Sequence, residues 1–345
     1  MGTLKDISKL TGYSLSTISK ALNGYSDVSE KTKEAIISAA EKLNYYPDYE
    51  GHKLQKRDTK TIALIIRGLA DSNQDGDPVI SDIIKGVAMY SLESDIDMAL
   101  YHLSNDRQRE ISYYKFCRSR NIDGAILLGF GMNDPYILEA KNTSYPIVLF
   151  DAFLKNESTN YGSVTIDNVK MAQEATQYLI DTGHQTIAFI NGRKEAQVSR
   201  LREEGYRNAI FKAYKNIDES LIEYGDFMQK RAYNAALKLL QTRHQIDAIF
   251  CASDMMATGV YEAARELGLK IPDDLSVIGF DGVPLSKYVQ PPLTTVKQDF
   301  VKMAYKSAEL LRNIVYQHQQ TATIMVDAEL IIRESTIPRR KATKR

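Results

Sequence analysis

The stretch YSLSTISKALNG, from Tyr13 to Gly24, concentrates side chains that could bind a nucleic acid. Among its polar side chains are four short hydroxyls and one ammonium group, those of Ser14, Ser16, Thr17, Ser19 and Lys20. A helix from a protein core would carry Leu and Ala at these positions. Short hydroxyl donors and a lysine instead suit hydrogen bonds to phosphates and to the edges of bases. The composition of this stretch therefore indicates a short helix with a polar partner.

The elements that would position these groups are three short helices within residues 1–47. Each helix begins at a residue that can cap a helix N-terminus: Thr3, Ser14 and Ser29. Asp6 completes a capping box with Thr3, and Thr11–Tyr13 reads as a tight turn between the first two helices. Ile18 and Leu22, four residues apart, give the second helix an apolar face that can pack on the others.

Two helices joined by a short turn that contains a glycine are typical of a helix-turn-helix. In that motif the N-terminal residues of the second helix lie in the major groove. The residues that would face bases are Leu15, Ser16 and Lys20, and those that would contact phosphates or neighbouring base edges are Thr17, Ser19 and Asn23. A solvated helical bundle is the alternative at this point, because the first 60 residues carry ten Lys/Arg against eight Asp/Glu, a weak net charge of +2.

The overall composition limits the other classes of function. The 345 residues are 43% hydrophobic and 26% charged with zero formal net charge, so any nucleic-acid contact must come from a local patch. Cys117 and Cys251 form neither a disulfide framework nor a zinc-binding spacing, and we expect both thiols to be buried. The first residues lack the apolar region of a signal peptide, and no run reaches the roughly 18 apolar residues of a membrane span. We therefore expect a cytoplasmic protein with no membrane partner.

After residue 60 the sequence alternates short apolar runs with longer helical stretches. The runs are TIALII, MALYHL, DGAILLGF, PIVLFD, TIAFING, DAIFCAS and LSVIGFD. This alternation predicts an α/β fold with parallel sheets that helices cover on both faces. About 275 residues are many for one sheet, so two lobes are expected. Residues 48–60 are polar apart from Leu54 and read as a linker.

Motifs typical of enzymes are missing from the sequence. It contains no G-x-G-x-x-G fingerprint, no P-loop, no nucleophile elbow and no metal-ligand cluster. His184 and His244 stand outside any nucleophile pattern. We therefore expect no catalytic activity, no cofactor and no metal.

Three stretches together resemble the LacI/GalR family of bacterial transcriptional regulators. They are TLKDISKLTGYSLSTISKALNG (3–24), VSEKTKEAIISAAEKLNYYP (28–47) and IPDDLSVIGFDGVPLSKYVQPPLTTVKQDF (271–300). The resemblance covers nearly the whole chain. It implies an N-terminal three-helix helix-turn-helix headpiece plus hinge, followed by a two-lobed periplasmic-binding-protein-like domain with parallel sheets, which dimerises.

The resemblance also divides the chain. The implied parts are a headpiece (1–47), a hinge (48–60), an N-terminal lobe (61–162 and 293–323), a C-terminal lobe (163–292 and 324–338) and a basic tail (339–345). The tail is expected to be solvated, with a supplementary phosphate contact as the alternative. Leu54 matches a hinge leucine that wedges into the DNA minor groove in this family. Gly51 stands where the family usually has Ala, so folding of the hinge helix should be harder here. The implied DNA contacts are Thr3, Ser14, Leu15, Ser16, Thr17, Ser19, Lys20, Asn23 and Leu54.

An effector site between the lobes is implied as well. The positions that match it are Asp151, Arg202, Phe227, Ser253, Asp281 and Gln298. Arg202 and Asp281 together would fix vicinal hydroxyls, and the Phe227 ring would stack on a sugar. Arg202 could instead form a surface salt bridge and Phe227 a core contact. Asp281 could cap a turn, and Ser253 could cap the next helix. The segment Gly68–Ser81 lacks the N-P-F-F stretch of many relatives, so the ligand wall there must differ.

The implied function is that of a homodimeric DNA-binding regulator, expected to repress genes of carbohydrate uptake or catabolism. Each headpiece would read one half of a pseudo-palindromic operator in double-stranded DNA. A small effector, expected to be a carbohydrate, would change the affinity for that operator. A purine or a phosphorylated co-repressor protein is the alternative within the family, and a solute-binding protein is the alternative outside it. The sequence leaves open which effector binds, whether it induces or co-represses, and which operator is read.

Overall fold

The computed structural model describes residues 3–22, 25, 27–43, 45, 60–67, 78–140, 145–154, 160–242, 245–318 and 321–339. Several predictions fall on other residues. Those for Asn23, His244, the hinge with Gly51 and Leu54, residues 68–77 and the tail after residue 339 lie outside the described residues.

The headpiece contains the three predicted helices, α1 (Leu4–Thr11), α2 (Leu15–Leu22) and α3 (Glu30–Lys42). The predicted capping box is present, because the N–H of Thr3 donates to Asp6 Oδ2 at 3.0 Å and the N–H of Asp6 donates to Thr3 Oγ1 at 3.3 Å. Gly12 ends α1 with a φ of +76°, a left-handed conformation that glycine adopts without strain. The turn between α1 and α2 is thus the one that the sequence predicted.

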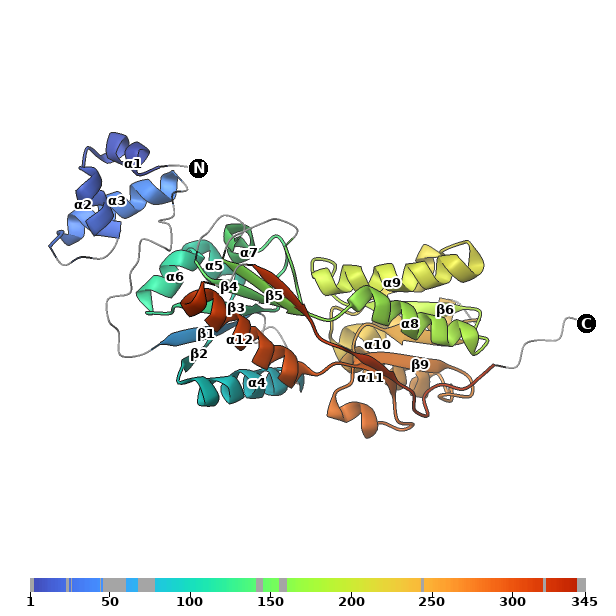
Figure 1. Cartoon of the computed structure of the whole chain (residues 1–345). Coiled ribbons are helices and arrows are strands. Elements are labelled where there is room, and N and C mark those ends of the chain that lie inside the picture. Colours follow the sequence, from blue (N-terminus) through green and yellow to red (C-terminus); the bar gives the residue numbers. More distant parts are fainter. Residues whose placement is uncertain are drawn as a thin grey trace, which may run out of the picture.

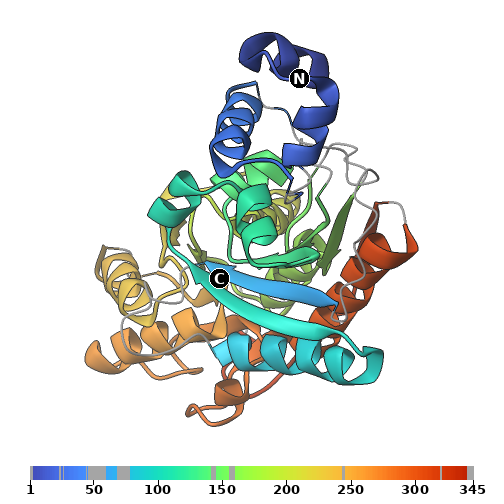
Figure 2. The same ribbon diagram turned by 90° about the vertical axis from the view of Figure 1, so that its left-hand side faces the viewer.

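A small core holds these helices together. Ile7, Ile18 and Ile36, one from each helix, are completely buried against one another. In Figures 1 and 2 the headpiece lies at the end of the molecule formed by the first lobe, away from the second lobe. The headpiece therefore has a core of its own and can present its polar faces outward.

The first lobe is a six-stranded parallel sheet in the order β11-β5-β4-β3-β1-β2. Its strands are β1 (Thr61–Arg67), β2 (Asp97–Leu103), β3 (Gly124–Leu128), β4 (Ile147–Phe150), β5 (Tyr161–Thr165) and β11 (Ala322–Met325), and its helices are α4 (Pro78–Ser94), α5 (Asn105–Glu110), α6 (Tyr113–Ser119), α7 (Pro135–Ala140) and α12 (Phe300–Gln317). Alternate residues of β1 enter different cores: Ile62 and Leu64 pack toward α4 and α12, and Ala63 and Ile65 pack toward α6 and α7. Both faces of the sheet are therefore covered, as the apolar runs predicted (Figure 1).

The second lobe is another six-stranded sheet, in the order β12-β10-β9-β8-β6-β7. Its strands are β6 (Ile187–Asn191), β7 (Ile222–Tyr224), β8 (Ala248–Cys251), β9 (Ser276–Asp281), β10 (Thr294–Lys297) and β12 (Glu329–Ile331), and its helices are α8 (Asn168–Asp181), α9 (Gln197–Tyr214), α10 (Gln229–Thr242) and α11 (Asp254–Glu266). Helices α8 and α9 cover one face, and α10 and α11 cover the other (Figure 1). All pairings are parallel except that of β10 with β12.

The antiparallel edge strand β12 departs from the prediction of parallel sheets, and its cause is geometric. Only three residues separate β11 in the first lobe from β12 in the second. Parallel strands of the same sheet need a crossover of a dozen or more residues. A chain that leaves one sheet at its carboxyl end and enters the facing sheet directly must run against the strands there.

The chain crosses between the lobes three times, after β5, β10 and β11, that is, after residues 165, 297 and 325. The expected boundary at residue 293 is therefore wrong for Thr294–Lys297, since these residues pair with β9 in the second lobe. The other two crossings lie two or three residues beyond the expected positions 162 and 323. An apolar run predicts a strand, but it does not say which of two sheets the strand joins.

Other predictions from composition can be compared with the described residues. Cys117 and Cys251 are both free and buried, as expected. In this part of the chain, no helix has the length and apolarity to cross a membrane. Within the same residues, no three His, Cys, Asp or Glu side chains are grouped as a metal site would require.

Candidate DNA interface and inter-lobe site

Helix α2 divides into a buried side and an exposed side. Ile18 and Ala21 are buried in the headpiece core, whereas Ser16 and Lys20 are exposed and Leu15 is 44% exposed. The three residues predicted to face bases thus lie together on the open side of α2.

The N-terminus of α2 carries the hydroxyls predicted to contact phosphates. Ser14 Oγ accepts the N–H of Thr17 at 3.1 Å, and the hydroxyls of Ser14 and Thr17 lie 2.8 Å apart. Ser14 is exposed, whereas Thr17 and Ser19 are partly buried. Thr3 is exposed at the N-terminus of α1. Helix N-termini attract anions, so these groups can receive phosphate oxygens.

Lys20 has a partner that the sequence did not reveal. Its Nζ lies 2.5 Å from Asp27 Oδ2, and both side chains are about half exposed. The Asp27 carboxylate raises the pKa of Lys20, and Lys20 lowers the pKa of Asp27. An exposed pair of this kind contributes little to stability, so Lys20 can exchange Asp27 for a phosphate or a base.

Between the lobes, Arg202 is the centre of a buried network. This residue of α9 is 3% exposed, and its guanidinium lies 3.8 Å above the ring centroid of Phe280. Its Nη1 donates to the carbonyl oxygen of Ala252 at 2.6 Å, and its Nε donates to Asn168 Oδ1 at 2.9 Å. The surface salt bridge considered as an alternative for Arg202 is therefore excluded.

Two carboxylates from different lobes face this guanidinium. Asp281, at the end of β9, lies 3.5 Å from Nη1, and Asp151, directly after β4 in the first lobe, lies 3.6 Å from Nη2. Both carboxylates are partly buried, and both residues have positive φ angles, +51° at Asp151 and +107° at Asp281. Strained backbone of this kind persists where the surrounding structure requires it and is concentrated at binding sites.

Gln298 and Asn168 complete the arrangement. Gln298 Nε2 donates to Asp281 Oδ1 at 3.0 Å, and Asn168 Nδ2 donates to Asp151 Oδ1 at 3.0 Å. We call the five residues Asp151, Asn168, Arg202, Asp281 and Gln298 the inter-lobe polar cluster. Sequence reasoning missed Asn168, although it lies three residues after β5, where the carboxyl ends of parallel strands form ligand sites. Gln298 Oε1 is buried and finds no hydrogen-bond donor among the described residues.

Ser253 and Phe227 contribute differently from the other predicted effector residues. Ser253 is buried at the N-cap of α11, where its Oγ accepts the N–H of Met256 at 3.2 Å, so its hydroxyl has the capping role considered as an alternative. Phe227 packs directly on Gly192, since a Cβ built on that glycine would lie 2.0 Å from Phe227 Cζ. Phe227 is partly buried. The structure therefore gathers four of the six predicted residues in one network, and Ser253 and Phe227 take no part in its hydrogen bonds.

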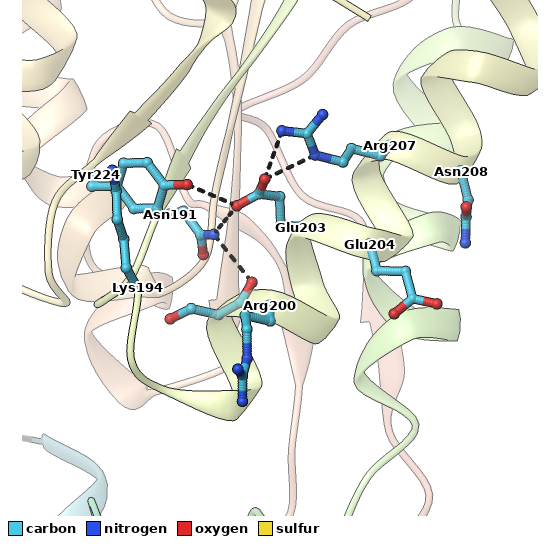
Figure 3. Close-up of a pocket in the computed structure, with 9 residues that line it drawn as sticks. Asn191, Lys194, Arg200, Glu203, Glu204, Arg207, Asn208 and Tyr224 are labelled. Atoms are coloured by element: carbon cyan, nitrogen blue, oxygen red, sulfur yellow. Dashed lines mark hydrogen bonds and ion pairs between the residues drawn. The ribbon is translucent and has the colours of Figure 1, made fainter. Parts of the chain in front are cut away.

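A cavity of about 450 Å³ lies elsewhere, lined by residues of α9 together with Asn191, Lys194 and Tyr224 (Figure 3). The partly buried carboxylate of Glu203 accepts hydrogen bonds there from Asn191 Nδ2, Tyr224 Oη and Arg207 Nε. Arg207 in turn binds Glu219 through both Nη atoms. Glu203 and Arg207 of this cavity thus pair with each other, and none of the six predicted effector residues lines it.

Comparisons with known proteins agree with this architecture. Residues 3–48 match the family described as bacterial regulatory proteins, lacI family, and residues 176–336 match the periplasmic binding protein-like domain. The HTH-type transcriptional regulator MalR of Clostridium butyricum is 32% identical over 338 residues, 96% of this chain and 98% of its own length. The HTH-type transcriptional repressor CytR of Escherichia coli K12 is 30% identical over 335 residues, 97% of this chain and 96% of its own.

The fold is also that of solved structures. The structure described as a transcriptional regulator CelR–cellobiose complex has a TM-score of 0.74 with 28% identity, and the match covers 97% of this chain and all of that one. A helix-turn-helix headpiece, two α/β lobes and full-length similarity to two regulators thus lead to one conclusion. The chain belongs to the lacI family of bacterial regulatory proteins and is a DNA-binding transcriptional regulator.

Proposed function

We propose that the protein represses genes of carbohydrate uptake or catabolism, and that a carbohydrate bound at the inter-lobe polar cluster sets its affinity for operator DNA. The observation that supports this most directly is the position of Arg202 between Asp151 of the first lobe and Asp281 of the second. Carboxylates and a guanidinium held together bind vicinal hydroxyls by charge-assisted hydrogen bonds. The unsatisfied Oε1 of Gln298 is an acceptor that a ligand hydroxyl would complete.

The DNA side of the proposal rests on the exposed face of α2. Leu15, Ser16 and Lys20 would read bases, and the hydroxyls at the N-terminus of α2 would bind phosphates. Leu15 can contact the methyl group of a thymine. The Ser16 hydroxyl can donate or accept a hydrogen bond, so it can bind either a donor or an acceptor on a base edge. Asn23 and the wedge residue Leu54 stay in the proposal as predictions from the family pattern.

A homodimer is part of the proposal. Met89 and Leu92 on α4 are 40% and 88% exposed, and Leu100 on the neighbouring edge strand β2 is 49% exposed. Exposed apolar side chains on an edge strand and on the helix that packs against it are typical of an interface. Two identical headpieces related by a two-fold axis would read a pseudo-palindromic operator.

Regulation would follow from the position of the ligand. An effector that contacts both lobes favours one relative orientation of them, and the headpieces are joined to the first lobe. Coupling is reciprocal, so an effector that weakens operator binding is itself bound less tightly by the DNA complex. The CelR–cellobiose complex among the similar structures supports a carbohydrate as the ligand. We place this function in the cytoplasm, where the operator is, and it requires neither catalysis nor a cofactor.

Fluorescence anisotropy with DNA from the region upstream of the gene tests both parts of the proposal. The wild-type dimer should bind one fragment more tightly than competitor DNA, and Ser16→Ala with Lys20→Ala should remove that preference. A screen of neutral and acidic carbohydrates, purines and nucleosides should then find a ligand that changes the affinity in wild type and not in Arg202→Gln. If the wild type shows no sequence preference, the DNA part is wrong. If only purines act, the carbohydrate part is wrong.

A further inference from the structure

Two further arginines face each other from opposite lobes beside the inter-lobe polar cluster. Arg67 ends β1 in the first lobe, and Arg193 follows β6 in the second. Arg67 Nη1 and Arg193 Nη2 both lie 3.5 Å from one acceptor, the carbonyl oxygen of Gly129. The two nitrogens are therefore at most twice that distance, about 7 Å, from each other. Charge-assisted N–H···O bonds measure about 2.7–2.9 Å, so one carboxylate or phosphate group can accept hydrogen bonds from both guanidinium groups.

The carboxylates that the structure describes around these arginines form an ion pair with only one of them, Arg67. Asp134 Oδ2 lies 3.1 Å from Arg67 Nε and also accepts the N–H of Gly131 at 2.7 Å. Among the described residues, no carboxylate lies within ion-pair distance of Arg193. Asp226 faces Arg193 but forms an ion pair with Arg231. Burial and the neighbouring Arg67 both lower the pKa of Arg193, whereas Asp134, Asp226 and Glu195 act against this at longer range. An anion between the two arginines would relieve their repulsion.

In each lobe, the arginine lies two strands away from a residue that is proposed to bind ligand hydroxyls. In the first lobe, the strand order β4-β3-β1 places Arg67 two strands from Asp151. In the second lobe, the order β9-β8-β6 places Arg193 two strands from Asp281. Two strand spacings place the backbones of these positions about 9–10 Å apart, so the arginines and the polar cluster occupy separate regions along the same edge of each sheet. Phe227 packs on Gly192, the residue directly before Arg193.

We infer that the effector is an acidic carbohydrate, whose carboxylate or phosphate group binds between Arg67 and Arg193 while its hydroxyls bind the inter-lobe polar cluster. This inference rests on the proposed effector site and adds the charge of the ligand to it. Because the two arginines come from different lobes, the anionic group would hold the lobes in one relative orientation. Recognition would then require charge at one end of the ligand and hydroxyls at the other.

The test compares matched ligands on the full-length protein by isothermal titration calorimetry and thermal shift. The neutral and acidic partners are glucose against gluconate, glucuronate and glucose 6-phosphate, and cellobiose against cellobionate and cellobiose 6-phosphate. We expect at least one acid to bind tenfold to a hundredfold more tightly than its neutral partner. Comparison of the sugar carboxylates with the sugar phosphates shows which of the two anionic groups the site prefers.

Substitutions of Arg193 test whether a preference for acidic over neutral sugars depends on the arginines. Arg193→Gln keeps a polar side chain without the charge and should bring the acid to within about threefold of the neutral sugar. Arg193→Lys should restore part of the difference, because a lysine keeps the charge and loses the two-pronged geometry. Arg200→Gln is the matched control, an exposed arginine of α9 that takes no part in the cluster, and should behave as wild type. Circular dichroism and operator binding establish that each variant is folded.

Inorganic phosphate alone provides a readout that does not depend on finding the natural ligand. It should raise the melting temperature of the wild type and of Arg200→Gln, and raise that of Arg193→Gln much less. Equal stabilisation of all three proteins would overturn the inference. So would neutral and acidic sugars that bind equally to wild type and to Arg193→Gln, and in that case the proposed carbohydrate site would stand. If Arg202→Gln binds every sugar as wild type does, the proposed site itself is wrong.

Discussion

The carboxylate of Asp254 accepts the backbone N–H of Val283 at 2.9 Å, and in this way the start of α11 fixes the loop that begins at Asp281. The same carboxylate accepts the hydroxyl of Thr295 at 2.5 Å. Asp254 is 1% exposed, and burial raises its pKa to about 7 despite these hydrogen bonds. A buried carboxylate that binds backbone N–H groups next to a residue with a φ of +107° is a positioning device for Asp281.

Asp254→Asn should therefore weaken effector binding without touching the headpiece. At pH 8, above the folded pKa of about 7, the amide keeps the shape of the carboxylate, but it presents an NH₂ group to donors and loses the charge. Losing a charged hydrogen bond costs about 1.5–3 kcal/mol, so we expect effector affinity to fall tenfold or more. Operator binding in the absence of effector should stay within twofold of wild type. Calorimetry and anisotropy measure the two quantities.

The control for this substitution is Asp106→Asn, an exposed acidic residue of α5 in the first lobe. It changes the net charge by the same amount and should alter neither the effector affinity nor the operator affinity. A folded Asp254→Asn protein with wild-type effector affinity would show that Asp281 needs no such support.

The stability of the protein should depend on pH through His184. This residue is buried between α8 and the sheet of the second lobe. Its Nε2 lies 2.8 Å from Ser276 Oγ, its Nδ1 lies 3.0 Å from the carbonyl oxygen of Leu179, and burial lowers its pKa. Below pH 6.5 the unfolded chain binds a proton that the folded chain resists, so this residue's contribution is complete above that pH and declines below it. Asp254 acts in the opposite direction between its unfolded pKa of about 3.9 and its folded pKa of about 7.

Because the effects of His184 and Asp254 oppose each other, the pH dependence of the wild type alone does not isolate either. The informative quantity is the difference in free energy of unfolding between wild type and a His184 variant. His184→Gln removes the titrating group and should be less stable than wild type at pH 7.5. That gap in free energy of unfolding should shrink as the pH falls to 5.5. Urea denaturation at three pH values measures it, and a gap that widens toward acid pH would contradict the assignment.

Helix packing offers a prediction about stability alone. A Cβ built on Gly205 of α9 would lie 2.2 Å from the carbonyl oxygen of Val169 and 2.8 Å from Ala172 Cβ, both on α8. Gly205→Ala must push these helices apart, at a cost of about 1–3 kcal/mol. Gly131→Ala is the matched control, since its new Cβ would meet its neighbours at 3.7 Å, an ordinary contact. Thermal unfolding should separate the two variants, and similar melting temperatures would refute the packing argument.

Local features of the fold were predictable from the sequence, and long-range ones were predictable only in part. The capping box of Thr3 and Asp6 spans three residues, so its pattern is visible in the chain itself. The polar face of α2 and the alternation of strands and helices are equally local. The antiparallel direction of β12 and the assignment of β10 to the second lobe depend on how two sheets face each other, which no short pattern encodes.

The same distinction holds for the site. Arg202, Asp151, Asp281 and Gln298 were found through their match to the family pattern, and the structure brings them together. Asn168 and Asp254 were missed as functional residues because they act through partners 34 and 41 residues away, Arg202 and Thr295. A search for polar residues at the carboxyl ends of strands would have found Asn168. No comparable rule identifies a buried carboxylate whose partner is a backbone N–H.

Asp27 provides the prediction for the DNA interface, because it pairs with the one lysine on the exposed side of α2. Asp27→Asn removes a negative charge beside the proposed DNA surface and frees Lys20 for a phosphate or a base. Operator affinity should rise severalfold at low salt, and the plot of log affinity against log salt should steepen by about one unit. Lys20→Ala should have the opposite effect on both quantities.

Glu34→Gln is the control of equal charge, since Glu34 is an exposed acid on α3. It should raise affinity less than Asp27→Asn, because it forms no pair with a predicted base-reading residue. In the double variant Asp27→Asn with Lys20→Ala, the gain should vanish, since the freed lysine is its cause. If the double variant still binds more tightly than Lys20→Ala by the full factor, the gain comes from general charge repulsion and Lys20 does not contact the DNA.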